Sequence, residues 1–218
     1  MKLQKLGGYA SIILVCLNIA MVGILITVFR GTTGLDIYDP DKMLNLYNTA
    51  SASFWTYYVL SILTGILTLL VTIALQERMQ AKAPNLMRLA VIAVSIFFAL
   101  ALSAEMSGIY RNTLVAQTND SSSFRAFLFL HEYLYFAGVF ALGWGFLLIG
   151  WAAFKTGKLS KMLGCIIFVY GILAITQFAF SISLQPIGLG LWGFVGLIVY
   201  AWLGAALLSN NGAKRGRT

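Results

Sequence analysis

Two acidic residues and the single histidine of this chain have types and spacing that could carry acid–base or ion-binding chemistry. Glu132 follows His131 directly, and Glu105 precedes both in an earlier apolar stretch. A charged side chain in such a stretch costs free energy unless it meets partners or water. Two carboxylates and an imidazole placed together could share a proton, bind a cation or an amine, or relay protons. They could also form a structural hydrogen-bonded cluster, with Arg111 or Arg125 as the counter-charge.

Other membrane chemistries need residues that this sequence lacks. Haem with two histidine ligands and catalytic zinc both need more than one histidine, and His131 is the only one in the 218 residues. No lysine lies within an apolar stretch to form a retinal Schiff base. Neither a Cys-x-x-Cys motif nor a phosphate-binding glycine loop is present. We therefore expect no cofactor and no metal centre.

The composition indicates a membrane protein. Hydrophobic residues make up 60% of the chain and charged residues 10%, against roughly 45–50% and about 25% in soluble domains. The apolar residues form runs of the length that a helix needs to cross a bilayer, about 20 residues. We predict a single all-α domain over residues 1–218, a polytopic bundle of six transmembrane helices near residues 8–28, 54–75, 89–110, 127–154, 162–182 and 189–208.

Helix geometry then brings the candidate residues to one depth. Glu105 lies six residues before Arg111, near the end of the third predicted helix, and Glu132 lies seven residues after Arg125, near the start of the fourth. Both are therefore about 9–10 Å below the same membrane boundary. Because consecutive helices joined by a short loop are usually neighbours, we predict that Glu105, His131 and Glu132 form one cluster, the polar niche, which opens to the extracytoplasmic side.

Further residues belong to this predicted polar side of the bundle. Tyr133 and Tyr135 are expected to form aromatic walls of the niche, and Gln177 is a further candidate ligand-binding residue in the outer part of the fifth helix. Asp39 followed by Pro40 predicts the start of a short helix in the first outer loop, since Asp caps a helix and Pro fits its first turn. This helix could be a lid over the niche or a simple connector.

Small residues recur on one face of three predicted helices, and such faces predict close helix packing. The set on the fourth helix repeats every seven residues. The set on the second predicted helix is Ser61, Thr64, Thr68 and Thr72. The set on the fourth is His131, Gly138, Gly145 and Ala152. The set on the sixth is Gly193, Gly196 and Gly204.

The basic residues predict the orientation, because loops rich in Lys and Arg stay in the cytoplasm. Eleven of the 15 lie at the N-terminus, in the second and fourth loops and in the C-terminal tail, and four lie on the other side. Both termini are therefore predicted to be cytoplasmic. The net charge of +8 reflects this topology and attraction to anionic headgroups, so we expect membrane lipids as partners and no nucleic acid.

A resemblance to a known family is carried by residues 142–150 (LGWGFLLIG), 155–159 (KTGKL) and 163–164 (LG). These residues are similar to the fourth and fifth helices of an uncharacterised family of bacterial six-helix integral membrane proteins, catalogued only as a domain of unknown function. The resemblance is concentrated in residues 127–175. It implies a multi-pass protein of the bacterial cytoplasmic (inner) membrane and supplies no activity, ligand or catalytic residue.

Two classes of function fit the sequence. The first is a non-catalytic bundle that binds a lipid, a small molecule or a protein partner in the membrane, including a second copy of the chain. The alternative is a small transporter or a proton-coupled membrane enzyme built on Glu105, His131 and Glu132. Transporters usually have broken helices or matching half-repeats, and the sequence shows neither, so we expect the non-catalytic class.

The topology can be tested with reporter fusions. A reporter placed after Thr218 or near Lys158 should read as cytoplasmic, and one inserted near Asp39 or Asn119 as extracytoplasmic, because of the eleven-to-four division of basic residues. An extracytoplasmic signal from the fusion at Thr218 would require an odd number of spans and would contradict the six-helix topology.

Overall fold

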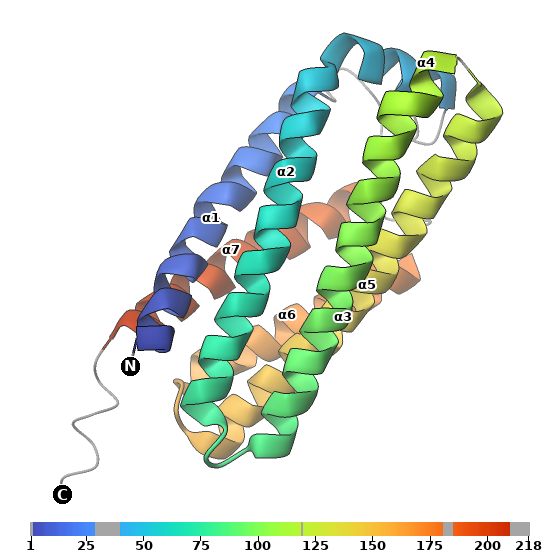
Figure 1. The fold of residues 1–218 in the computed structure, drawn as a ribbon. Helices are drawn as coiled ribbons and strands as arrows, with labels where there is room; N and C mark the ends of the chain where they lie inside the picture. Colours follow the sequence, from blue (N-terminus) through green and yellow to red (C-terminus); the bar gives the residue numbers. More distant parts are fainter. Residues whose placement is uncertain (1, 29–39, 119, 181–184, 210–218) are drawn as a thin grey trace, which may run out of the picture.

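The computed structural model describes residues 2–28, 40–118, 120–180 and 185–209, which are helical almost throughout, with no strand among them. They form a bundle of long helices (Figure 1). The helices are α1 (Lys2–Val28), α2 (Pro40–Met79), α3 (Pro84–Tyr110), the π-helical turn η2 (Arg111–Val115), the short α4 (Ala116–Thr118), α5 (Ser121–Thr156), α6 (Lys161–Phe180) and α7 (Gln185–Leu208). The predicted all-α fold is confirmed.

Four of these helices, α1, α2, α3 and α5, are long and apolar enough to cross a membrane. The described parts of α6 and α7 contribute shorter apolar stretches, Lys161–Gln177 and Gly193–Leu208. Large apolar side chains lie on the outside of the bundle, and Ile26 and Trp151 are 65% and 60% exposed. Such a surface would promote aggregation in water, so the bundle has the surface of a membrane protein.

Local sequence sets the ends of the helices. Each of the three prolines lies in the first turn of a helix, where a missing N–H is harmless: Pro40, Pro84 and Pro186. At the start of α5, the carboxylate of Asp120 accepts hydrogen bonds from the backbone of Ser122 and Ser123. Hydrogen bonds from Ser123 and Ser122 lower the pKa of Asp120 to about 2. Gly157, with a left-handed φ of 63°, follows the last turn of α5 and ends it.

The short helix predicted after Pro40 is present, but it continues into α2. Only Ala50 departs from helical geometry within α2 (φ −128°, ψ 28°), and the chain bends there. Residues 40–49, here named the roof segment, therefore lie across one end of the bundle (Figure 1). Asp39, the predicted cap, lies outside the described residues. The other predicted bounds agree with the structure to within six residues, with α1, α3, α5 and α7 each beginning earlier than predicted. The predicted end of the fifth span, residue 182, lies outside the described residues.

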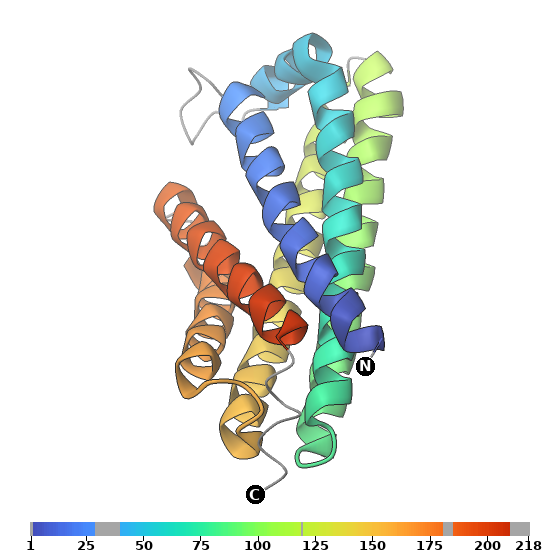
Figure 2. The same ribbon diagram turned by 90° about the vertical axis from the view of Figure 1, so that its left-hand side faces the viewer.

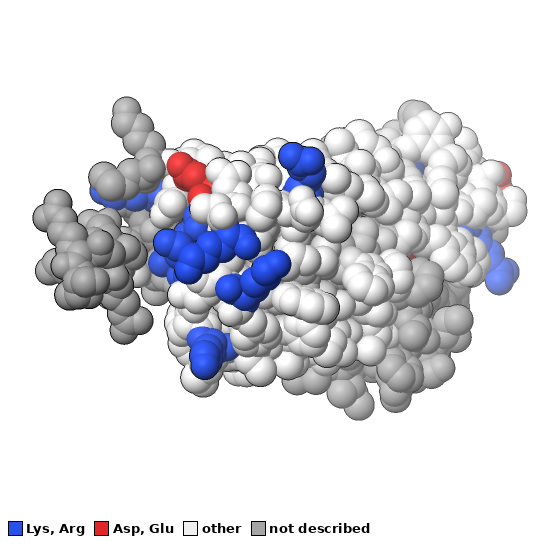
Figure 3. All heavy atoms as spheres, turned by 90° about the horizontal axis from the view of Figure 1, so that it is seen from below, with Lys and Arg blue, Asp and Glu red and all other residues white. Residues whose placement is uncertain are grey.

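The two ends of the bundle differ in charge. Residues 80–83, residues 157–160, the first turn of α1 and the last turn of α7 lie at one end, here named the basic end (Figure 1). Lys and Arg side chains gather on this end when it is viewed from below (Figure 3). The opposite end, here named the roofed end, carries the roof segment, η2 and α4 (Figure 1).

Glycines bring the backbones of α5 and α6 into direct contact. A Cβ on Gly143 would lie 2.8 Å from the carbonyl oxygen of Gly171, and a Cβ on Gly171 would lie 2.7 Å from the carbonyl oxygen of Gly143. Gly150 similarly faces the backbone of α6, whereas Gly138 and Gly145 face α3. The stripe predicted on α5 therefore packs on α3. A second glycine face, formed by Gly143 and Gly150, packs on α6 and was not predicted.

The single packing face predicted for the glycines of α7 is wrong, because these glycines do not meet one partner. Gly204 lies against the backbone of α1 at Gly8, where α1 and α7 cross near the basic end (Figure 2). Gly196 lies against Tyr170 of α6, and a Cβ added at Gly193 would meet no neighbouring helix within 4 Å among the described residues.

The hydroxyl residues of α2 do face neighbouring helices. The Thr64 hydroxyl donates to the sulfur of Met21 on α1 over 3.7 Å. The Thr68 and Tyr200 hydroxyls are 3.3 Å apart, which joins α2 to α7. These contacts tie α2 to the rest of the bundle at several heights.

Replacing Gly171 with Leu should destabilise the protein, because the new side chain meets the backbone of α5 rather than a movable side chain. We expect a fall in thermal stability in detergent that corresponds to roughly 1–3 kcal/mol, or loss of folded protein. The matched control is Gly23→Leu on α1, where a Cβ meets nothing within 4 Å. Equal unfolding temperatures for the two variants would contradict close packing of α5 on α6.

Candidate functional site

The candidate site is built on the buried face of α3 at the roofed end. Glu105 lies on this face together with the small residues Ala101, Ala104 and Gly108, which let neighbouring helices approach closely. Glu105 is 1% exposed. The hydroxyl of Ser61 on α2 donates to its Oε1 over 2.5 Å. The other oxygen, Oε2, is buried and makes no hydrogen bond within the part of the chain that the structure describes.

His131 reaches the same place from α5. Its Nδ1 lies 2.8 Å from the carbonyl oxygen of Ala104. Because a carbonyl only accepts, Nδ1 carries the proton, and Nε2 is the acceptor in the neutral ring. The ring stacks on Tyr135, with centroids 6.4 Å apart and 7° between the planes. Gly108 gives it room, since a Cβ there would lie 3.0 Å from Nδ1 and 3.1 Å from the ring of Tyr58.

The carboxylate of Glu132 lies close enough to interact electrostatically with Glu105. Glu132 follows His131 on α5 and is partly exposed, whereas Glu105 is buried. In the structure, His131 contacts the backbone of Ala104, the residue before Glu105, and Glu132 is within the range of electrostatic interaction with Glu105.

Arg111 supplies the counter-charge, since it interacts electrostatically with both carboxylates. It is 3% exposed, and its Nε donates to Oδ1 of Asn112 over 2.8 Å while Nη2 donates to the Tyr58 hydroxyl over 3.2 Å. The guanidinium also lies over the ring of Phe124, 5.1 Å from its centroid. Its Nη1 is buried and has no hydrogen bond among the described residues. The π-helical turn that begins at Arg111 buries two consecutive polar side chains, and such turns are frequent at functional sites.

With both carboxylates ionised, Glu105 and Glu132 would carry two negative charges against the one positive charge of Arg111. Among the described residues, the carboxylates of Glu105 and Glu132 interact with the guanidinium of Arg111, while a neutral His131 adds no charge. An uncompensated charge in an apolar bundle is costly. One proton or one monovalent cation would balance the site, and Oε2 of Glu105 is an oxygen that is free to take it.

The roof segment covers the niche instead of leaving it open. Its Met43 and Tyr47 are buried and pack in one cluster with Phe54, Tyr58 and Phe124. Tyr58 belongs to both this cluster and the niche, so the two are continuous. The niche was expected to open to the extracytoplasmic side, but the structure encloses Glu105, while His131 and Glu132 are partly exposed.

Two residues proposed for the niche point away from it. Arg125 is exposed on α5, with its guanidinium over the ring of Phe129 one turn further along, 5.6 Å from the centroid. Tyr133 is 66% exposed and forms no wall of the niche. Both were assigned to the niche only because of their depth in the membrane. Their positions around the axis of α5 direct their side chains outward.

Gln177 is buried on α6, and its amide makes no hydrogen bond in the described part of the protein. It lies at a different height from the niche. Gly143 contacts both Gly171 and Ile175 and is therefore level with residue 173 of the antiparallel α6, which places Gln177 level with Val139. That is eight residues from His131, or about 12 Å along the bundle.

Three residues of the site were not assigned to it by the sequence. Ser61 was expected only as a packing residue of α2, although it lies at the depth of Glu105. Tyr58 could also have been predicted by counting residues from the membrane boundary to estimate its depth. Asn112, whose Nδ2 donates to the Tyr58 hydroxyl over 2.5 Å, lies in the π-helical turn, which has no signal in the sequence.

The chain matches no protein-family model, and neither curated proteins nor solved structures gave a significant match. The resemblance of residues 127–175 to an uncharacterised bacterial family therefore stays a prediction.

Tyr58→Phe should destabilise the roofed end, because it removes the hydroxyl that accepts hydrogen bonds from Arg111 and Asn112. Leaving buried donors without an acceptor costs about 1–3 kcal/mol. The matched control is Tyr133→Phe, which removes a hydroxyl from an exposed residue. Thermal unfolding in detergent measures both, and a Tyr58→Phe variant as stable as the control would show that the hydroxyl does not hold the site together.

Proposed function

We propose that this chain is a non-catalytic, six-span protein of the cytoplasmic membrane, with both termini in the cytoplasm, that binds a small monovalent cation in the polar niche. The observation that carries the proposal is the buried Oε2 of Glu105, which has no hydrogen bond among the described residues. A carboxylate oxygen without a partner in an apolar bundle is costly and favours a bound cation or proton, and at Glu105 a second carboxylate, Glu132, interacts with the same group.

The surroundings of Glu105 suit a cation better than an anion or a neutral ligand. Glu132 adds a second carboxylate, and Arg111 balances only one of the two. The aromatic rings of Tyr58, Tyr135 and His131 lie around the same position. Aromatic faces attract ammonium groups, and carboxylate oxygens attract both alkali ions and protonated amines. The proposal therefore covers an alkali ion or a small protonated amine.

A binding role is favoured over catalysis by how the histidine is held. Nδ1 of His131 donates to the backbone carbonyl of Ala104. In a catalytic triad, a carboxylate would instead accept this hydrogen bond and orient the histidine as a base for the nucleophile. Groups of three His, Cys, Asp or Glu residues that could hold a metal do not occur in the described residues.

Six spans are proposed from the lengths of α6 and α7. These helices have 20 and 24 residues, which corresponds to about 30 and 36 Å, and the hydrocarbon core is about 30 Å thick. With α1, α2, α3 and α5, they would make six spans. An even number of spans supports termini on one side of the membrane, and the positive-inside rule assigns the basic end to the cytoplasm.

The second candidate function is a small transporter or proton-coupled enzyme. It is favoured by the position of Glu132, which is partly exposed and interacts electrostatically with the buried Glu105. A proton could reach Glu105 by way of Glu132, and the cation would then be a proton.

The two functions can be separated by measuring thermal stability of the purified protein against cation type and pH. If the niche binds a cation, Na⁺, K⁺ or methylammonium at a hundred times its Kd should stabilise the protein by about 2.7 kcal/mol. Glu105→Gln keeps the shape and removes the charge, so it should abolish this stabilisation. Glu77→Gln, which removes a carboxylate near the basic end, is the control and should retain it.

Wild-type protein that responds to pH but to none of these cations, with the response lost in Glu105→Gln, would favour the proton-linked function. A folded Glu105→Gln variant with the same cation and pH dependence as wild type would overturn both.

A further inference from the structure

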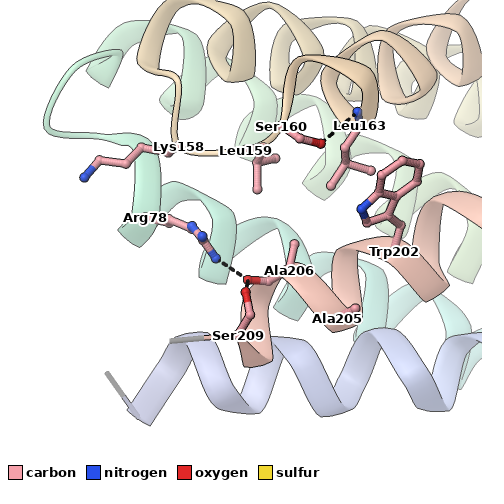
Figure 4. A pocket seen from close by; sticks show the side chains of 9 residues that line it. All are labelled: Arg78, Lys158, Leu159, Ser160, Leu163, Trp202, Ala205, Ala206 and Ser209. Carbon is pink, nitrogen blue, oxygen red and sulfur yellow. Dashed lines mark hydrogen bonds between the residues drawn. The ribbon is translucent and has the colours of Figure 1, made fainter. Parts of the chain in front are cut away.

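A pocket of about 340 Å³ lies at the basic end, far from the niche (Figure 4). Three parts of the chain form it: the last turn of α2, the α5–α6 turn with the start of α6, and the last turns of α7. Its lining consists of Arg78, Lys158, Leu159, Ser160, Leu163, Trp202, Ala205, Ala206 and Ser209.

The pocket is positively charged. Arg78 is held against it by a hydrogen bond from Nη1 to the carbonyl oxygen of Ala206, over 2.5 Å (Figure 4). Lys158 is exposed, and its side chain extends outward at the rim (Figure 4). The described residues that line the pocket include these two cations and no acidic residue. The site is therefore suited to an anion.

The start of α6 adds to the positive electrostatic potential of the pocket. The hydroxyl of Ser160 accepts a hydrogen bond from the backbone N–H of Leu163 over 3.2 Å, which makes Ser160 the cap of α6. The N-terminal end of a helix has a partial positive charge and favours phosphate and carboxylate groups. Arg78, Lys158 and the start of α6 thus bring positive charge to one place from separate elements.

The rest of the pocket is apolar. Leu159 and Leu163 are buried in its wall, and Trp202 is partly buried. Met162, next to Leu163, is 64% exposed on the outside of the bundle. A tryptophan near the end of an apolar helix is typical of the membrane–water interface. The pocket therefore combines cations with apolar surface at the depth of lipid headgroups.

We propose that this pocket binds the phosphate group of an anionic membrane phospholipid. Its volume lies within the range of small-ligand sites, about 300–1,000 Å³, and the apolar wall can contact the first part of the acyl chains. The residues that follow Ser209 in the sequence include Lys214, Arg215 and Arg217. Both that tail and the pocket are positively charged. A separate anionic molecule therefore complements the pocket better than the tail would.

Lipid binding to the full-length protein in detergent tests the proposal, with native mass spectrometry as the readout. Phosphatidylglycerol should bind more tightly than phosphatidylcholine. Lys158→Gln should weaken phosphatidylglycerol binding about fivefold, the effect of one interfacial cation. Lys155→Gln is the matched control, because Lys155 is exposed nearby but does not line the pocket, and it should bind as wild type does.

Arg78→Gln is a second variant that should weaken binding further, provided that its unfolding temperature shows a folded protein, since Arg78 also binds the end of α7. Equal binding of the two lipids, or equal losses in Lys158→Gln and Lys155→Gln, would overturn the proposal. Competition with inorganic phosphate distinguishes a lipid headgroup from free phosphate as the ligand. If it displaces the lipid at millimolar concentration and stabilises the protein as much, the site takes a free anion and the assignment to lipid is wrong.

Discussion

A carboxylate buried among apolar helices constrains the whole roofed end of this protein. Glu105 is 1% exposed, and an ionised group in that position is tolerated only with hydrogen bonds and an opposite charge nearby. Ser61 supplies the hydrogen bond from α2, and Arg111 supplies the charge from the end of α3. Arg111 in turn is held by Tyr58 and Asn112. Each of these polar groups thus supplies a hydrogen bond or an opposite charge to another buried polar group of the site.

The register between α3 and α5 makes this arrangement possible. Three residues of α5 contact α3 at intervals of seven: His131 meets Ala104, Gly138 meets Phe97, and Gly145 meets Val94 and lies near Ala90. A shift of the two helices by one turn would move His131 and Glu132 away from Glu105 by about 5 Å. The glycines of α5 are therefore part of the site, although they are far from its chemistry, because they fix the height at which its polar groups meet.

Sequence reasoning predicted the elements well and the surroundings of the site only in part. Helix positions follow from hydropathy and helix length, and the approach of Glu105 to His131 and Glu132 follows from depth on consecutive helices. Depth does not determine direction, so Arg125 and Tyr133 were placed in the niche although they face outward. Register between α5 and α6 has no local signal, so the sequence did not show that Gln177 is about 12 Å from the niche along the bundle. Asn112 lies in the π-helical turn, which has no signal in the sequence either.

The kink in α2 divides the parts of the protein that the two sites use. Ser61 at the niche and Arg78 at the basic end lie on the same continuous stretch of α2, 17 residues or about 26 Å apart. The departure from helical geometry in α2 is at Ala50, between the roof segment and the first residues that bind the niche. Before the kink, Met43 and Tyr47 pack against Tyr58. Beyond it, Ser61, Thr68 and Arg78 contact α3, α7 and the end of α7. The kink therefore lets one helix contribute to both sites, since its first ten residues lie across the roofed end and the remainder runs along the bundle to Arg78.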